Sequence, residues 1–305
     1  MATFRTTLPE VFEDRQAEVF FMNYSMEPSQ YKKVFNVVPS SKAYEDWFEV
    51  SGLGQFRTKA EGTPVTYDDP VQGTRRRITH TTFALGFRAT EEALDDAQYD
   101  VIERQSADLG VAGREHEEIL AWSVFNNNAD ANYPTIDGLA LASTAHVILK
   151  PKDPAVATDS NLASPGIALS ITGLEDALTV MRTTKSREDR FMPLKPAFLI
   201  INPALAHTAY KLLESEYEIN TNENQVSTVS SSRTGISAID TPYVTDTDNW
   251  ALVCQKSQHK LTFHTRMKMR FDSSTDSQTK DKLFDARYRA SVVAKDWRGT
   301  YFSNV

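Results

Sequence analysis

Cysteine is almost absent from this chain of 305 residues, which contains only Cys254. One thiol excludes an internal disulfide framework and the zinc or iron–sulfur sites that need several cysteines. We therefore expect a reducing compartment. Cys254 ends the apolar run that begins at Trp250, which favours a buried, unreactive thiol over a nucleophile.

Long apolar runs are also missing. A membrane-spanning helix needs about 20 consecutive apolar residues, whereas the longest runs here, such as 197–201, have the length of a strand. The first residues turn acidic by Glu10 without an apolar segment, so we expect no signal peptide. With 40% hydrophobic and 24% charged residues, the composition is that of a globular protein outside the membrane.

No motif of a known active site stands in the sequence. The six histidines include no pair four residues apart on a predicted helix, as a zinc protease requires, and the phosphate-binding Walker pattern is absent. Gly52-Leu53-Gly54 lacks the third glycine of a dinucleotide site, and no nucleophile elbow surrounds Ser143 and His146. We predict no catalytic, cofactor or metal site and no enzymatic activity.

Two acidic or polar stretches imitate metal sites without completing them. Asn126, Asn128 and Asp130 alternate as in a calcium loop, but Ala131 stands where the loop needs glycine, which favours an ordinary Asx turn. The segment 114–118 has one histidine among its acids, and we interpret it as the solvated face of a helix.

Charge is unevenly distributed along the chain. The net charge of −8 argues against a protein whose main work is wrapping nucleic acid. Residues 91–118 hold ten acidic and two basic residues, residues 256–298 hold eleven basic and five acidic ones, and residues 57–88 hold six basic and three acidic ones. Such blocks are usually solvated faces. The alternative is a set of complementary surfaces that meet within one subunit or between copies.

The first third of the sequence predicts an arm, a hairpin and a long helix. Residues 1–45 are interrupted by prolines, with a short helix around 9–22. Residues 46–88 carry glycine and proline punctuation and the alternation Phe83, Leu85, Phe87, which predicts one long hairpin that needs support from outside. Thr90 is a good N-cap for a helix over 91–126 of about 50 Å, which two glycines, Gly110 and Gly113, are expected to bend.

The remaining sequence predicts a mixed α/β unit followed by strands. We expect a helix beginning at the capping box 172–175, strands over 196–201 and 250–254, a helix over 203–214, and a loop over 216–237. From Leu261 to Phe271 apolar residues alternate with basic ones, and residues 288–294 repeat the alternation. An arm, a projecting basic hairpin and an overlong acidic helix leave surface that one subunit cannot cover, which favours an assembly.

This order of elements resembles the major capsid proteins of tailed bacteriophages, which have the Hong Kong 97-type fold. The resemblance rests on an ordered combination of stretches, of which the last, the Trp250 strand, 260–271 and 287–299, would return the chain to the peripheral domain. Phe48 to Gly54, with 59–62 and 65–68, looks like the extended E-loop of that family; Gly86 to Glu92 looks like the entry to its spine helix; and 137–141 with 143–146 looks like the opening of its axial domain.

The resemblance implies an α+β fold with an N-terminal arm (1–45), an extended β-hairpin or E-loop (46–88), a peripheral domain with a long spine helix (89–134 and 256–305) and an axial α/β domain (135–255). It implies a structural protein that self-assembles into the icosahedral head shell around the packaged double-stranded DNA of a tailed phage. An encapsulin-type compartment shell is the alternative of the same fold, and a soluble α+β enzyme with a dispersed site is the alternative from another class.

The resemblance also implies partners and a location. The chain would pair with itself in pentamers and hexamers, and with a separate scaffolding protein, a portal protein and decoration proteins. It would enclose genomic DNA without sequence-specific binding, contact no membrane and reside in the virion capsid after assembly in the bacterial cytoplasm. Lys59 is a candidate for the intersubunit crosslink of some members, but no asparagine partner can be matched to it.

Charge predicts which residues lie between subunits. We expect the basic E-loop to dock on acidic surface of a neighbour, for example on its spine helix. The predicted interface residues are Arg57, Lys59, Arg75, Arg76, Arg77, Glu91, Glu92 and Asp95.

Overall fold

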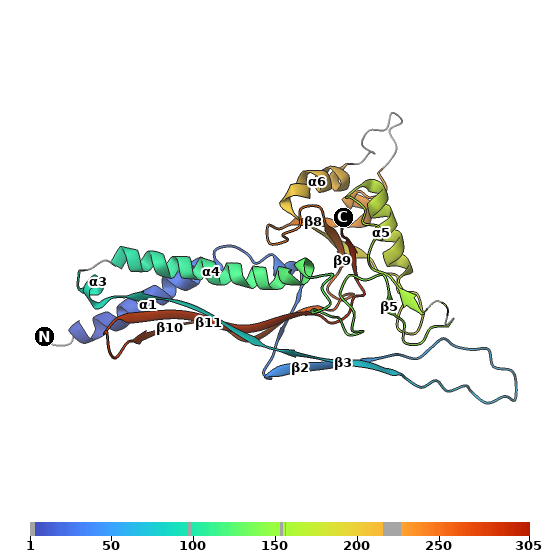
Figure 1. Cartoon of the computed structure of the whole chain (residues 1–305), viewed down its shortest axis with the longest axis horizontal. Helices are drawn as coiled ribbons and strands as arrows, with labels where there is room; N and C mark the ends of the chain where they lie inside the picture. The colour runs from blue at the N-terminus through green and yellow to red at the C-terminus, as the bar shows by residue number, and fades with distance from the viewer. Residues whose placement is uncertain (1–3, 97–98, 153–154, 156, 216–226) are drawn as a thin grey trace.

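The computed structural model describes residues 4–96, 99–152, 155, 157–215 and 227–305 (Figure 1). An elongated part carries two long helices on one side of a sheet, a compact part holds a second sheet with helices, and a hairpin projects beneath the compact part. The helices are α1 (Phe4–Ser25), α2 (Tyr31–Val34), α3 (Glu91–Asp95), α4 (Tyr99–Asn126), α5 (Ile171–Thr183), the 3-10 helix η2 (Pro203–Leu205), α6 (Ala206–Glu214) and α7 (Ser231–Thr234).

The strands fall into two four-stranded sheets and two pairs. The elongated part has the order β1 (Asn36–Pro39), β10 (Leu261–Thr275), β11 (Lys282–Ala294), β4 (Thr81–Ala89), and the compact part has β12 (Thr300–Ser303), β9 (Trp250–Cys254), β7 (Pro196–Ile201), β8 (Ser237–Asp240). The pairs are β2 (Tyr44–Val50) with β3 (Gln72–Thr79) and β5 (His146–Val147) with β6 (Thr158–Asp159). No helix among the described residues has the length and apolarity to cross a membrane.

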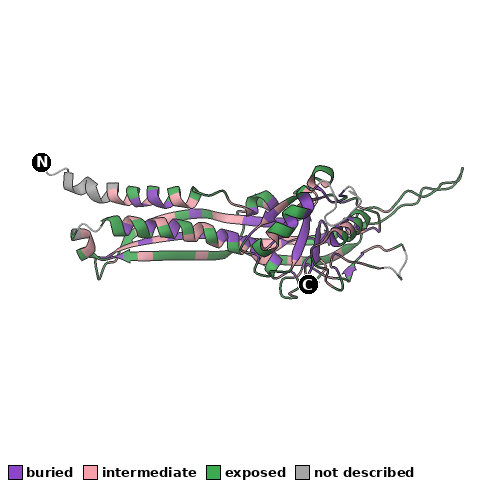
Figure 2. Ribbon diagram, turned by 90° about the horizontal axis from the view of Figure 1, so that it is seen from above, coloured by how far each residue is buried: buried purple, intermediate pink, exposed green. Residues whose placement is uncertain are grey.

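The predicted alternation of the C-terminal strands is confirmed over 268–270 of β10 and 288–290 of β11. Met269 and Tyr288 are buried toward the helices, while Lys268 and Arg270 are exposed on the opposite face. At the start of β10 both faces are covered, since Thr262, His264 and Phe263 are all buried. The sheet therefore exposes one face to solvent in the part farther from the compact part, whereas both of its faces are covered near the start of β10 (Figure 2).

The predicted hairpin ends earlier than expected. Only β2 and β3 pair with each other, and the strand with Phe83 and Phe87 is β4, which pairs antiparallel with β11 along its whole length. The alternation correctly predicted a strand but could not say which partner it has, because strand pairing depends on residues 200 positions away.

The long acidic helix forms as two pieces, α3 and α4, and α4 continues through both glycines without interruption. Thr90 caps α3 as expected, accepting a hydrogen bond from the backbone N–H of Ala93. Gly110 instead lets α1 approach α4. A Cβ atom at Gly110 would lie 2.5 Å from the backbone oxygen of Phe20, so only glycine allows the two helices to pack this closely.

The compact part follows the sequence in its strands and departs from it at helix ends. β7 and β9 have the predicted bounds, and Asn202 caps η2 with Pro203 in its first turn. The helix predicted to begin at the capping box 172–175 begins at Ile171, and its cap is Ser170, which accepts from the N–H of Gly173. β8 and β12 were not predicted; residues 216–226 of the expected loop lie outside the described residues.

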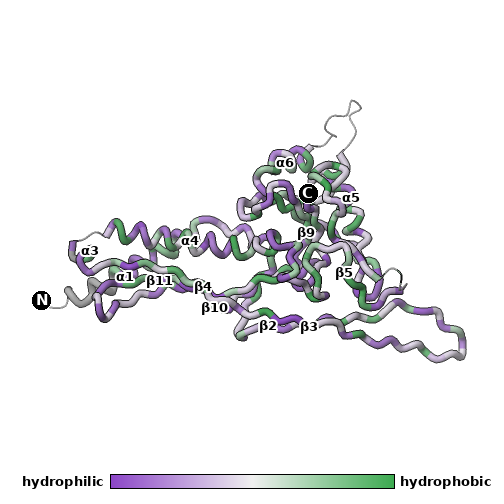
Figure 3. Tube along the Cα trace, in the orientation of Figure 1, coloured by the Kyte–Doolittle hydropathy of each residue, from purple (hydrophilic) through white to green (hydrophobic). Residues whose placement is uncertain are grey.

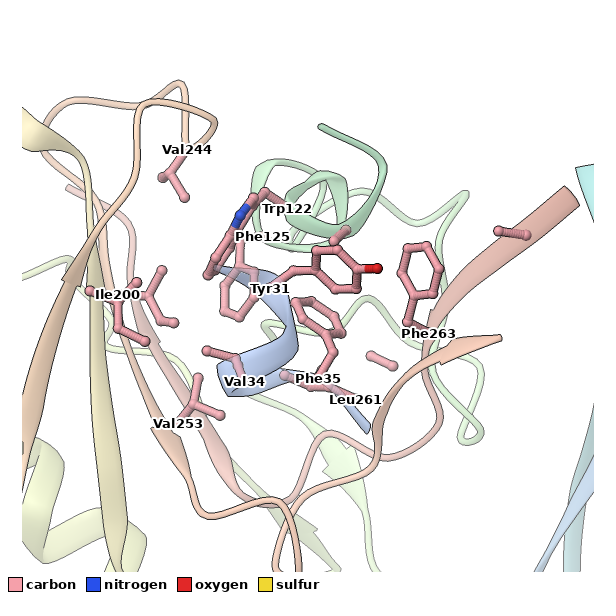
Figure 4. Packing of buried hydrophobic residues seen from close by; sticks show 14 of the residues in the cluster. Tyr31, Val34, Phe35, Trp122, Phe125, Ile200, Val244, Val253, Leu261 and Phe263 are labelled. Carbon is pink, nitrogen blue, oxygen red and sulfur yellow. The ribbon is translucent and has the colours of Figure 1, made fainter. Parts of the chain in front are cut away.

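One hydrophobic core joins the two parts. It includes Phe35 from the arm, Trp122 and Phe125 from the end of α4, Leu261 from β10 and Val253 from β9 (Figure 4). Phe35 meets both Trp122 and Phe125 edge-on, with ring centroids 6.0 Å apart in each pair. A second cluster lies within the compact part between its sheet, α5 and α6.

We expect Gly110→Ala to lower the free energy of unfolding by about 1–3 kcal/mol, because the added methyl group collides with the backbone of α1. Gly113→Ala is the matched control. Its Cβ would meet the flexible end of Met269, and alanine raises helix propensity by about 1 kcal/mol, so this variant should be neutral or stabilised. Urea unfolding followed by circular dichroism measures both; equal effects would contradict the close helix contact.

Candidate assembly surfaces

Residues 51–71 form an extended loop at the end of the hairpin that packs on no other element along most of its length (Figure 1). Its hydrophobic positions are scattered among hydrophilic ones (Figure 3). Phe56 is fully exposed and Tyr67 is 89% exposed, and Leu53 and Val65 are also exposed. Large aromatic side chains left in water on an extended segment indicate a surface that another molecule covers.

The base of this loop is fastened to the compact part. Arg187 donates through Nε to Glu49 Oε1 at 2.7 Å and through Nη2 to Asp296 at 2.5 Å, and Glu49 is buried. Glu188 accepts from the N–H of Gly52. These contacts fix where the hairpin leaves the molecule, so the exposed loop points in a defined direction.

The structure separates the three consecutive arginines that the sequence analysis grouped. Arg75 and Arg77 both pair with Asp46 on the facing strand, and Arg77 also lies over the ring of Tyr44 at 3.8 Å. The arginine between them, Arg76, lies on the other face of β3, because side chains alternate along a strand. Two of the three consecutive arginines therefore have a partner within their own hairpin.

The other predicted interface residues lie far apart in the structure. Arg57 and Lys59 lie on the extended loop, and neither makes an ion pair with any residue that the structure describes. Glu91 and Glu92 are exposed in the first turn of α3, and Asp95 ends that helix. α3 lies at the opposite end of the molecule from the loop (Figure 1), so the predicted basic and acidic residues do not meet within one chain.

The interpretation of residues 114–118 as a solvated face is wrong for its last two acids. Glu117 and Glu118 are buried, and Glu118 is only 1% exposed. Glu118 accepts hydrogen bonds from the backbone N–H groups of Gln30 (2.7 Å) and Tyr31 (3.2 Å) and from Trp122 Nε1 (2.8 Å). Glu118 thus accepts hydrogen bonds from two N–H groups at the start of α2 that have no partner within the helix.

Glu117 holds the arm through two phenols. Its two carboxylate oxygens accept from the hydroxyl groups of Tyr24 (2.8 Å) and Tyr31 (3.2 Å). Burial raises the pKa of Glu117 and of both tyrosines. These side chains lie 86 and 93 positions away in sequence, which is why residue spacing alone could not show the contact.

A histidine pair lies where the hairpin leaves the elongated sheet. His80 bonds Ser291 Oγ at 2.9 Å and Ser40 Oγ at 3.2 Å, and its ring lies 5.9 Å from that of His264. Both ring nitrogens of His264 are buried without a hydrogen-bond partner among the described residues. Burial, with Lys295 nearby, lowers the pKa of His264 to about 4, and burial also lowers the pKa of His80.

The residues weighed as chemical candidates have structural roles. Cys254 is buried in β9, and burial raises its pKa to about 12. His146 is buried against the ring of Trp297. Its Nδ1 pairs with Asp137 at 2.6 Å and its Nε2 lies 3.3 Å from Leu141 O and 3.1 Å from Asn161 Oδ1, so both ring nitrogens are already engaged. Asp130 caps the backbone of Asn132, as in an Asx turn. No group of metal-binding side chains occurs within the described part of the chain.

The chain was compared with known families and structures. The model of a family described as phage capsid protein matches residues 73–302. No curated protein matches. The procapsid of bacteriophage JBD30 is 16% identical with a TM-score of 0.54, covering 98% of this chain and 75% of that one.

Two further solved structures are similar over nearly the whole chain. Microbacterium phage Oxtober96 matches with a TM-score of 0.56 at 10% identity, covering 91% of each chain. A virus-like particle from Pyrococcus furiosus matches with a TM-score of 0.55 at 11% identity, covering 94% of this chain and 96% of that one. At these identities the similarity shows the fold.

We expect Glu118→Ala to destabilise the chain by about 3 kcal/mol, since three buried donors lose their acceptor. Glu115→Ala, on the exposed face of the same helix, should change the free energy of unfolding by less than about 0.5 kcal/mol. Limited proteolysis measures release of the arm, because cleavage within 26–35 should become faster when the arm leaves α4. An intact arm in Glu118→Ala would contradict its anchoring by this carboxylate.

We expect stability to fall as the pH drops from 6.5 toward 4. In the folded chain the pKa of His264 and of His259 is about 4, below the ordinary value of 6.5. Between these two values the unfolded chain binds more protons than the folded one. The free energy of unfolding is therefore full above pH 6.5 and is lost progressively as the pH falls toward 4. His264→Phe should flatten the pH dependence of the unfolding midpoint across this window.

Proposed function

The chain belongs to the phage capsid protein family, and from that premise we propose that its copies form the closed icosahedral head shell around the packaged double-stranded DNA of a tailed phage. It is a structural shell protein with the α+β fold of Hong Kong 97-type capsids, located in the virion capsid. The exposed aromatic loop is the observation that supports self-assembly most directly.

The loop supports assembly because one chain cannot bury it. Phe56 and Tyr67 lie on the extended segment, and the contacts of Glu49 and Glu188 hold only its base. We propose that the loop lies on a neighbouring subunit, where the two aromatic side chains are buried and Arg57, Lys59 and Arg76 meet that subunit's surface. Aromatic residues and arginine supply most of the binding energy at protein interfaces.

We further propose which parts carry which contacts. The arm (1–45) and the E-loop hairpin (46–88) would reach neighbours, although β4, at the end of the second segment, belongs to the elongated sheet. The peripheral domain would comprise 89–134 and 256–305. The axial domain, 135–255, would surround the centres of pentamers and hexamers. The continuous core between β10, α4 and β9 supports movement of these two domains as one body.

The remaining parts of the proposal concern partners and place. We propose that shells assemble in the bacterial cytoplasm with a separate scaffolding protein, a portal protein and decoration proteins, that the shell encloses DNA without reading its sequence, and that the chain catalyses no reaction. The negative net charge supports enclosure without sequence-specific binding.

An encapsulin-type compartment is the second candidate, favoured by the fold similarity to the virus-like particle from Pyrococcus furiosus. Negative-stain electron microscopy of the purified chain, expressed alone and with a scaffolding gene, tests both. Particles or capsomer rings are expected; nucleic acid inside would favour the phage head, protein cargo the compartment, and a uniformly small species would contradict both.

We expect Phe56→Ser combined with Tyr67→Ser to abolish particle formation, because both aromatic anchors of the proposed contact are lost. Since both side chains are exposed in the single chain, its free energy of unfolding should change by less than about 0.5 kcal/mol. Phe191→Ser, which removes an exposed aromatic side chain from the compact part, is the control and should assemble. Normal particles from the double variant would contradict the loop's role.

A further inference from the structure

Strand β10 leaves its regular pairing with β11 twice. Its register with β11 shifts between Thr265 and Met267 and again between Met267 and Arg270. At each shift β10 has one residue more than β11, which is a β-bulge, and bulges redirect side chains that would otherwise alternate.

The bulges line a hollow of about 510 Å³ that is rich in cations. Its lining residues are Arg266, Met267, Lys268, Met269, Arg270 and Arg289. We name this hollow the basic hollow. A concave surface with one sign of charge concentrates the electrostatic potential and attracts the opposite charge.

The cations of the basic hollow are not neutralised by their own chain. Within the described residues, the side chains of Arg266, Lys268 and Arg270 make no ion pair or hydrogen bond, and the Nε of Arg266 is buried without a partner. Arg289 donates only to the backbone oxygen of His80, at 3.1 Å. In a chain of net charge −8, such a group of unpaired cations indicates an anionic partner from outside.

The nearest carboxylates in the strand register do not change this conclusion. Asp272 pairs with Arg287 at 2.8 Å, and Asp285 lies opposite Asp272. Arg287 itself lies directly opposite Arg270, and like charges in that position destabilise a sheet.

We propose that the acidic start of the long helix in a second copy of the chain docks in the basic hollow. The acidic start consists of Glu91, Glu92, Asp96 and Asp100, all exposed and without an ion pair to any described residue. Residues 91–100 contain five carboxylates and no cation, so their charge matches that of the hollow. The proposal rests on the proposed function, because it requires assembled copies.

The two surfaces cannot meet within one chain. Ala89, which precedes the acidic start, lies opposite Lys282, and Arg289 is seven residues further along β11. At about 3.3 Å per residue this separation is about 23 Å. The contact joins two different surfaces on the two copies, and such head-to-tail contacts close into rings when the rotation permits.

Other anions fit the basic hollow less well. The carboxylates of the extended loop are interleaved with Arg57 and Lys59, and one of them, Asp68, already pairs with Lys150 at 2.9 Å. Binding of a nucleic-acid backbone needs a continuous track of cations, whereas Asp272 and Asp285 interrupt the open face beside the hollow.

Disulfide trapping tests the contact directly, because the natural Cys254 is buried and will not interfere. Shells of the variant Glu92→Cys/Arg270→Cys, oxidised and run without reductant, should give ladders of linked chains. Asp248→Cys/Arg270→Cys, with its first cysteine at an exposed position of the compact part, is the matched control and should stay monomeric. Monomers from the first pair in intact shells would overturn the proposal.

Charge exchange gives a second readout. Lys268→Glu/Arg270→Glu should lower the assembled fraction about tenfold or more, as should Glu91→Lys/Glu92→Lys, and a single chain with all four changes should recover assembly. All four positions are exposed, and unchanged circular dichroism confirms folding. Failure of the fourfold variant to recover assembly would overturn the proposal.

Two further outcomes separate the causes of failure. Normal assembly of Lys268→Glu/Arg270→Glu with loss of enclosed nucleic acid would overturn the proposal in favour of a nucleic-acid contact. Particles from the unaltered chain beside unlinked variants would overturn this inference alone, whereas absence of particles from the unaltered chain under every condition would overturn the proposed function as well.

Discussion

The buried carboxylate of Glu118 is the contact on which the arrangement of the N-terminal third depends. It receives the two free N–H groups at the start of α2 and the indole of Trp122. A buried carboxylate is stable only when hydrogen-bond donors surround it. Removal of one donor would therefore destabilise the buried charge of Glu118, and with it the contact between the arm and α4. Through α2 it places Phe35 in the core shared by the two sheets, and β1 and the hairpin follow from there.

The sequence predicted elements whose cause is local and missed those whose cause is remote. Strands β7 and β9 follow from apolar runs, and the caps Thr90 and Asn202 follow from a side chain that serves its own neighbours. β8 and β12 are four residues each and begin with Ser237 and Thr300, so neither has a pattern of its own. They form because β7 and β9 offer free edges.

The same distinction applies to the candidate surfaces. The block of negative charge over 91–118 was visible in the sequence, but the fold divides it: Glu91 and Glu92 are exposed, whereas Glu117 and Glu118 become internal hydrogen-bond acceptors. Likewise the run of three arginines divides by strand alternation, with two of them paired to Asp46. Net charge of a segment therefore does not predict the charge that its surface presents to a partner.

The fastening of the hairpin base has a mechanical consequence. Glu49, near the end of the ladder of β2 and β3, is tied to Arg187, and Gly52, just past the ladder, is tied to Glu188. A pull on the loop tip is therefore shared between the ladder and these ties, and part of the load passes through Arg187 to Asp296. Detachment of the loop from the compact part therefore requires these ties to break together with the ladder, whereas a free hairpin can open one pair of residues at a time.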